Sequence, residues 1–138
     1  MADLSITAGN VLAADGAVSK AEFIAGAAIT AGQAVYIDAA ASSVAKLAQA
    51  DGTSAEATLK GIALNGAAAG QPVMIATSGS LDVGATLVVG MVYCVSTAAG
   101  GICPYADLGS SHYVSIVGVA TAADALKLVM FNSGAEKP

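Results

Sequence analysis

Short hydrophobic runs recur along the chain from Ile29 onward, separated by turn-forming residues. The runs are rich in β-branched and aromatic residues, and Gly, Ser, Asn or Asp flank them. Short strands between such turns are typical of an antiparallel β-barrel or β-sandwich. We therefore predict an all-β fold with at least seven strands and very little helix. The clearest strand candidates are Ala34–Ile37, Pro72–Ile75, Val92–Val95, Tyr113–Val117 and Leu126–Met130.

The sequence gives little evidence for helices. The Ala-rich stretch Ala39–Ala50 is interrupted by Ser42-Ser43-Val44 and is followed by the turn-forming pair Asp51-Gly52. One short helical segment, Thr53–Ala57, is compatible with the sequence.

The first 28 residues differ from the rest because they show no clean hydrophobic period. Two interpretations follow for residues 1–28: an extended N-terminal arm, or the first strands of the domain, which often complete a barrel. Residues 29–138 form the predicted β-domain. A chain of 138 residues lies within the usual size of one domain.

Similar strings recur about 57 positions apart. A shift of 57 aligns Val35-Tyr36 with Val92-Tyr93 and Gly61-Ile62-Ala63 with Gly118-Val119-Ala120. A shift of 56 aligns Val73-Met74 with Val129-Met130, and Ala50-Asp51 with Ala106-Asp107. Two similar β-modules in one domain are one explanation of these matches. Chance matches in a β-rich sequence of low complexity are the alternative.

Composition limits the core and the partners. Hydrophobic residues make up 56% of the chain and charged residues only 11%, against roughly 25% in an ordinary domain. Much of the hydrophobic fraction is Ala, which indicates a thin core, and the uncharged surface must be polar or covered by partners. The chain has no Arg and a net charge of −5, which argues against nucleic-acid binding.

No segment near the N-terminus combines a basic region with an apolar core, so we expect no secretory signal and a product that stays in the cytosol. The stretch Val83–Ala106 carries no charge before Asp107, but glycines and Pro104 interrupt it. We interpret it as strands and turns, and we predict no membrane association.

Cys94 and Cys103 flank the pair Gly100-Gly101 and could face each other across a hairpin. Two packed thiols are the ordinary expectation in a reducing cytosol. A cross-strand disulfide formed after cell lysis is the alternative.

The sequence holds few residues for catalysis, and we predict no catalytic, metal or cofactor site. His112 is the single histidine, and its neighbour Ser111 would point to the opposite face of a strand. Two cysteines and one histidine do not make a zinc-ligand set, and the carboxylates are scattered singly. Asp38 and Asp107 are interpreted as turn residues.

Several strings together resemble small capsid decoration, cement or head-fibre proteins of tailed bacteriophages. The resemblance covers about Ile29–Gly134, and its strings are turn-and-strand patterns rather than catalytic motifs. They are Gly32–Asp38, Gly61–Val73, Gly100–Leu108 and Val117–Ala120.

This resemblance implies a β-fold on the outer surface of the phage head, made in the host cytoplasm, where it bridges capsomers and stabilises the mature shell. The major capsid protein would be its partner, and a homo-oligomer, with a trimer favoured, is expected. No nucleic acid or membrane partner is implied. The alternative is a head-fibre or adhesin-type module that contacts a host surface or glycan.

An N-terminal arm would suit docking on a capsid, because a strand can add to a sheet edge through backbone hydrogen bonds. Its apolar side chains are the docking candidates: Leu4, Ile6, Val11 and Leu12.

Overall fold

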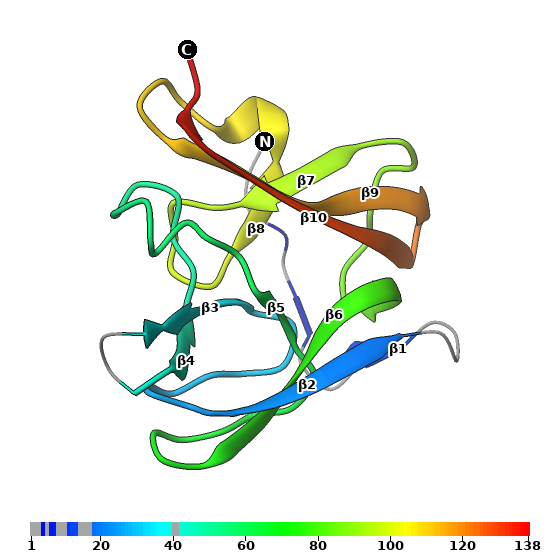
Figure 1. The fold of residues 1–138 in the computed structure, drawn as a ribbon. Helices are drawn as coiled ribbons and strands as arrows, with labels where there is room; N and C mark the ends of the chain where they lie inside the picture. Colours follow the sequence, from blue (N-terminus) through cyan, green and yellow to red (C-terminus); the bar gives the residue numbers. More distant parts are fainter. Residues whose placement is uncertain (1–3, 5, 8–10, 14–17, 40–41) are drawn as a thin grey trace.

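The computed structural model describes residues 4, 6–7, 11–13, 18–39 and 42–138, and it is all-β and barrel-like (Figure 1). Ten strands are present in these residues, together with a three-residue 3-10 helix, η3 (Tyr105–Asp107). The prediction of an all-β fold with at least seven strands is confirmed. The strands are β1 (Val11–Ala13), β2 (Ser19–Ile24), β3 (Ala34–Asp38), β4 (Val44–Leu47), β5 (Gly61–Ala63), β6 (Pro72–Val83), β7 (Val92–Val95), β8 (Ile102–Pro104), β9 (Tyr113–Ala122) and β10 (Ala125–Glu136).

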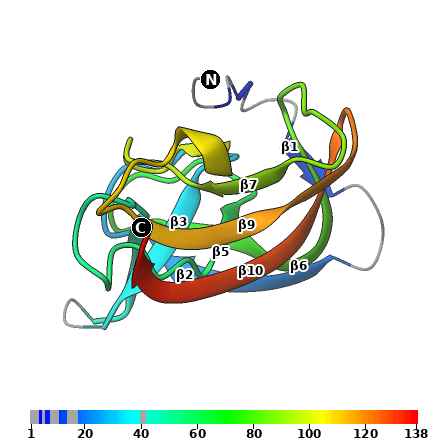
Figure 2. The same cartoon turned by 90° about the horizontal axis from the view of Figure 1, so that it is seen from above.

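The long strand β6 belongs to two sheets. Its first half pairs with β2 and β5, in a sheet with the order β4-β3-β5-β6-β2, which we call sheet B. Its second half pairs with β1 and β10, in a sheet with the order β1-β6-β10-β9-β7-β8, which we call sheet A. Gly79, with φ +99°, lies where the two halves meet. Figure 2 shows β10, β9 and β7 side by side in sheet A.

Sheet B curls until its two outer strands meet. Ala25, which follows β2, forms a parallel bridge to Ala45 of β4, and the amide of Gly26 donates to the carbonyl of Ala45 at 2.8 Å. All other strand pairs are antiparallel. The curled sheet gives the molecule its barrel-like form.

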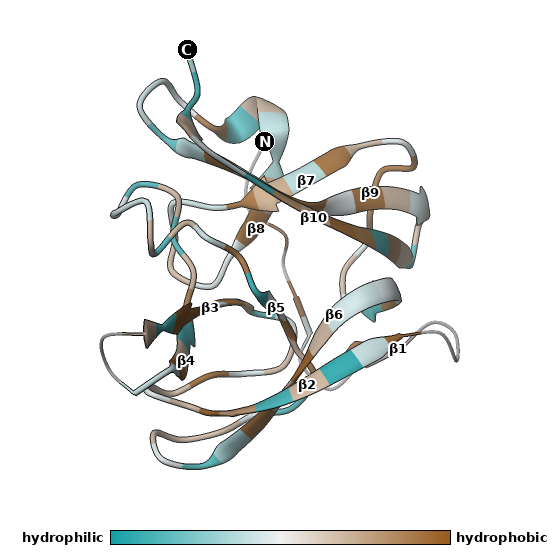
Figure 3. Cartoon of the chain, viewed as in Figure 1, coloured by the Kyte–Doolittle hydropathy of each residue, from teal (hydrophilic) through white to brown (hydrophobic). Residues whose placement is uncertain are grey.

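Alternation along β3 divides the interior into two cores. Ala34 and Tyr36 pack in the larger core, between sheets A and B, whereas Val35 packs in a smaller core inside the curl of sheet B. Successive side chains of a strand point to opposite faces, so a strand buried on both faces reads as a continuous apolar run. The outer strand β2 instead alternates, with Lys20 and Glu22 exposed. Figure 3 shows hydrophilic and more hydrophobic residues alternating along β2.

The internal repeat is present in the topology. In each module the first two strands pair with each other as a hairpin. The third strand pairs with the first strand, and the fourth, a long strand, pairs with the third. The first module is β3, β4, β5 and β6, and the second is β7, β8, β9 and β10. Registers match: Ala34 pairs with Ile62, and Val92 pairs with Val119.

These registers correct part of the sequence alignment. Gly61-Ile62-Ala63 and Gly118-Val119-Ala120 are equivalent at the predicted shift of 57. For β3 and β7 the registers require a shift of 58, so the match of Val35-Tyr36 with Val92-Tyr93 is one residue off. The match of Val73-Met74 with Val129-Met130 is also wrong, because Ala76 of β6 corresponds to Lys127 of β10. A slip of one residue turns every side chain to the other face.

Four strands begin after the same kind of turn. In each turn a glycine with φ between +78° and +91° occupies the third position, and the fourth amide donates to the first carbonyl. This is the geometry of a type II turn, which requires positive φ at its third residue. The four turns are Thr30–Gln33, Ala68–Gln71, Val88–Met91 and Ala98–Gly101.

Residues 53–57 form a hydrogen-bonded turn rather than the short helix considered for them. The amide of Glu56 donates to Thr53 Oγ1 at 3.2 Å, and the amide of Thr53 donates to Glu56 Oε1 at 3.0 Å. This reciprocal pair is a capping box, but a single α-type hydrogen bond, from the amide of Ala57 to Thr53, is followed by one of 3-10 type, from Thr58 to Ala55. One turn without a continuing apolar face does not propagate.

Candidate functional site

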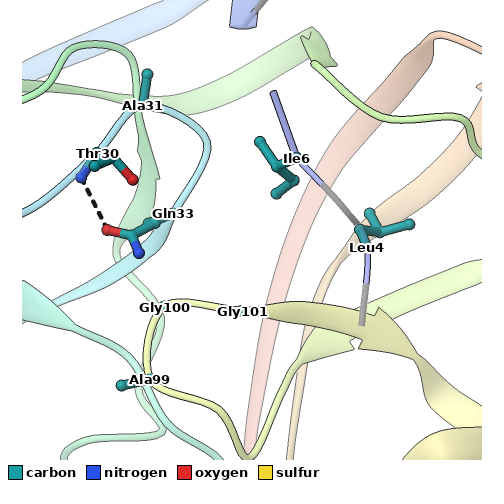
Figure 4. A pocket seen from close by; sticks show the side chains of 8 residues that line it. All are labelled: Leu4, Ile6, Thr30, Ala31, Gln33, Ala99, Gly100 and Gly101. Carbon is teal, nitrogen blue, oxygen red and sulfur yellow. Dashed lines mark hydrogen bonds between the residues drawn. The ribbon is translucent and has the colours of Figure 1, made fainter. Parts of the chain in front are cut away.

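A small pocket lies between two type II turns and the N-terminal segment (Figure 4). Its volume is about 170 Å³. Its lining combines aliphatic side chains and glycine backbone with the polar side chains of Thr30 and Gln33, and none of its lining residues is charged. The pocket therefore offers no charged acid or base. It is lined by Leu4, Ile6, Thr30, Ala31, Gln33, Ala99, Gly100 and Gly101.

The side-chain amide of Gln33 in this pocket already bonds within the protein. In Figure 4 the Gln33 side chain reaches back to Thr30, whose amide donates to Gln33 Oε1 at 2.9 Å. Gln71 makes the same 2.9 Å contact with the amide of Ala68 in a second turn. The repeated arrangement shows that Gln33 has a structural role in its turn.

The four docking candidates of the N-terminal segment lie against the body of the protein. Leu4 and Ile6 are half-buried and pack on the larger core, and the amide of Leu4 donates to the carbonyl of Ile102 in β8 at 2.8 Å. Val11 is buried and pairs with Val83 of β6. Leu12 pairs with Asp82 in the backbone register, and its side chain lies outside the described residues. Docking through Leu4, Ile6 or Val11 would require the segment to leave the body.

His112 and Ser111 lie in a turn that precedes β9. The amide of Gly109 donates to His112 Nδ1 at 2.9 Å, and Ser111 has a φ of +72°. The backbone of the two residues pairs with Lys137 near the C-terminus. The imidazole nitrogen that could act as a base is therefore engaged in the turn.

Cys94 and Cys103 pair with each other across the β7–β8 hairpin, as expected from their positions on either side of the Gly100-Gly101 turn. Both are buried in the larger core, and they are not joined by a disulfide. Burial raises the pKa of Cys94 to about 11, and Lys137 opposes this only partly. A neutral buried thiol is a poor nucleophile and a poor metal ligand.

An ion pair crosses from β3 to β4. Lys46 Nζ lies 2.9 Å from Asp38 Oδ2, and this hydrogen bond raises the pKa of Lys46. Water reaches both side chains and screens the pair, so its contribution to stability is small. Asp38 ends β3 while Asp107 ends η3, and within the described ranges no three His, Cys, Asp or Glu side chains gather as a metal site.

Large apolar side chains are exposed at several places that sequence reasoning did not single out. Val88 and Val89 are 54% and 63% exposed in one of the type II turns. Val129 and Phe131 are 55% and 57% exposed on β10. Their signal in the sequence was the pair Val88-Val89 beside a glycine, and the unbroken run Val129-Met130-Phe131.

Val129 and Phe131 lie on the exposed face of β10. Buried Leu126 and Leu128 alternate with exposed Lys127 and Val129, and Phe131 continues the exposed series. A bulge interrupts the pairing with β9 at this point, because Leu128 pairs with Gly118 and Phe131 pairs with Ile116, so Val129 and Met130 together lie opposite Val117. Met130 has a φ of +46°, which is rare for a residue with a side chain.

Within the described part of the chain, no helix has the length and apolar character needed to cross a membrane. Comparison with protein-family models, curated proteins and solved structures finds no match to this chain.

Proposed function

We propose that this chain is a structural protein that decorates the outer surface of a tailed-bacteriophage head and stabilises the mature shell. Its partner is the major capsid protein, which it contacts through apolar surface rather than through a polar cleft. The phage assignment comes from the resemblance of the turn-and-strand strings.

The observation that carries the proposal is the exposure of large apolar side chains on a chain with few charges. Val88, Val89, Val129 and Phe131 are each more than half exposed, and each would lose contact with water at a protein interface. Removing such surface from water contributes roughly 25 cal/mol per Å². Several separate apolar contact points suit a protein that touches more than one neighbour.

The distribution of polar groups also supports a structural role. The Gln33 amide, the His112 imidazole and the Asp38 carboxylate each bond to a neighbouring group of the fold. The pocket between the two type II turns has no charged residue in its lining. These features favour binding to another protein over chemistry on a small substrate.

Co-sedimentation with purified capsids tests the proposal. The protein should pellet with expanded capsids and not with unexpanded ones, and it should raise the temperature at which expanded shells release their DNA. Stabilisation follows because a ligand that binds only the assembled lattice favours that lattice by mass action. Absence of binding to expanded capsids, or binding to host cells in their place, would contradict it.

A further inference from the structure

Two of the four type II turns occupy equivalent places in the two modules. In Thr30–Gln33 the amide of Gly32 donates to Ala63, and in Val88–Met91 the amide of Gly90 donates to Ala120, both at 2.8 Å. Ala63 and Ala120 are themselves equivalent, since they lie at the ends of the matched Gly-Ile-Ala and Gly-Val-Ala strings. The two turns are thus the same structural element, used twice.

The first of these turns is covered by the N-terminal segment. A Cβ atom built on Gly32 would lie 2.5 Å from Ile6 Cγ2 and 3.0 Å from Val11 Cγ2. Ile6 and Val11 therefore rest directly on the glycine, and Ala31 beside it is buried. An extended segment with β-branched side chains is what this turn binds within the chain.

The second turn has no such cover among the described residues. A Cβ atom on Gly90 would meet no described atom within 4 Å, and Val88 and Val89 are both mostly exposed. The turn is nevertheless well anchored. The amide of Val88 donates to the Tyr93 hydroxyl at 3.0 Å, and the amide of Leu87 donates to the carbonyl of Ala123 at 2.8 Å.

We propose that the turn Val88–Met91 is a docking surface for an extended peptide segment of a partner protein that carries β-branched or other aliphatic side chains. We infer the chemistry of this segment from the equivalent turn Thr30–Gln33, which is covered by the aliphatic side chains of Ile6 and Val11. The identity of the partner as the capsid protein rests on the proposed function, whereas the surface and the chemistry of the segment do not.

The physical case for this surface is its preorganisation. The backbone of the turn is fixed by hydrogen bonds, so binding would order few additional groups. Gly90 has no side chain and leaves open space beside the two valines. An aliphatic side chain of the partner could enter this space and contact the backbone of the turn. The partner would shield both valines from water, as Ile6 and Val11 shield the first turn.

A synthetic peptide with the sequence of residues 1–13 is a direct probe, because it contains the segment that covers the first turn. Titrated into the full chain labelled with ¹⁵N, it should shift the amide resonances of Val88, Val89 and Gly90 in a saturable way. The matched control peptide has Leu4, Ile6 and Val11 replaced by Ser and should produce no such shifts. The double variant Val88→Ser/Val89→Ser should bind the unmodified peptide about tenfold more weakly.

Sedimentation of the wild-type chain with expanded capsids, set beside the peptide titrations, separates the two proposals. If the peptide binds the wild-type turn while the wild-type chain does not sediment with capsids, the docking surface is supported and only the proposed function fails. If the double variant binds the peptide as tightly as the wild type, the docking surface is wrong. Shifts confined to Thr30–Gln33 would indicate exchange of the N-terminal segment and would also overturn it. Circular dichroism of the double variant should remain unchanged, since both side chains are exposed.

Discussion

Gly61 and Gly118, 57 positions apart in the sequence, make the same close approach to a neighbouring strand. A Cβ atom at Gly61 would lie 2.4 Å from the carbonyl oxygen of Ala76, and one at Gly118 would lie 2.1 Å from that of Lys127. Ala76 and Lys127 hold equivalent positions in β6 and β10. The two modules thus share a backbone contact that no side chain would tolerate.

Replacing either glycine by Ala should therefore destabilise the protein. Gly61→Ala and Gly118→Ala should each lower the free energy of unfolding by about 2 kcal/mol or more, because the strands must move apart. Urea denaturation followed by circular dichroism measures this. Gly66→Ala is the control, since its added Cβ would meet only the carbonyl of Ile29 at 3.7 Å. Equal stability of all three variants would show that the approach is not constrained.

The N-terminal segment should contribute to stability through Val11. This side chain is 7% exposed, so Val11→Ala should cost about 2 kcal/mol from lost burial and the cavity left behind. Val88→Ala is the matched control at an exposed position and should change the free energy of unfolding by less than about 0.5 kcal/mol. Deleting residues 1–13 should destabilise the fold further. A truncated protein as stable as the full chain would support a detached arm.

The amide of Asn132 should hold the loop before β5 against β10. Its Oδ1 accepts from the amide of Leu59 at 2.8 Å, and its Nδ2 donates to the carbonyl of Leu59 at 3.0 Å, as a paired strand would. Asn132→Ala should lower the free energy of unfolding by about 2 kcal/mol, because the amide and the carbonyl of Leu59 both lose their partner. Asn132→Asp keeps the acceptor, but at pH 7 its second carboxylate oxygen would face the carbonyl of Leu59, so this variant should also be less stable than the wild type. Wild-type stability of Asn132→Ala would contradict the predicted role of the amide.

The thiols of Cys94 and Cys103 should react slowly in the native state at pH 8. Burial raises the pKa of Cys94 to about 11, against 9.0 for the free group, so the thiolate is scarce and inaccessible. Because the folded-state pKa is the higher one, the contribution of Cys94 to stability is complete below about pH 9. It is lost as the pH rises toward 11.

A chromogenic disulfide reagent measures both thiols. Both should titrate rapidly after denaturation and slowly before it, and Cys94→Ser and Cys103→Ser assign the two phases. Rapid native reaction of either thiol at pH 8 would contradict the buried arrangement.

Much of the strand content could be predicted from the sequence, because β3, β6, β7, β9 and β10 each contain a run of β-branched or aromatic residues. Strands β1, β5 and β8 have three residues each, too few to show a period. In β2, Lys20 and Glu22 alternate with Ala21 and Phe23, a signal that the surrounding small residues obscured.

The candidate surfaces were harder to predict. Val129 and Phe131 stand in an apolar run, and such a run does not show whether both faces of its strand are covered by other elements. Val88 and Val89 lie in a turn, where no hydrophobic period indicates which side chains are buried. The repeat was detected most reliably at Gly61 and Gly118, because a backbone approach restricts the residue type more than core packing does.

The position of β6 in both sheets has a consequence for the order of folding. Ser19 pairs with Ser78 and Val11 pairs with Val83, so neither β1 nor β2 has its partner until the chain has been synthesised past its midpoint. Such distant pairings make folding slow, since loop closure must precede the contacts that reward it. On the ribosome, β1 and β2 emerge well before their shared partner β6, which then pairs with both of them and joins the two sheets.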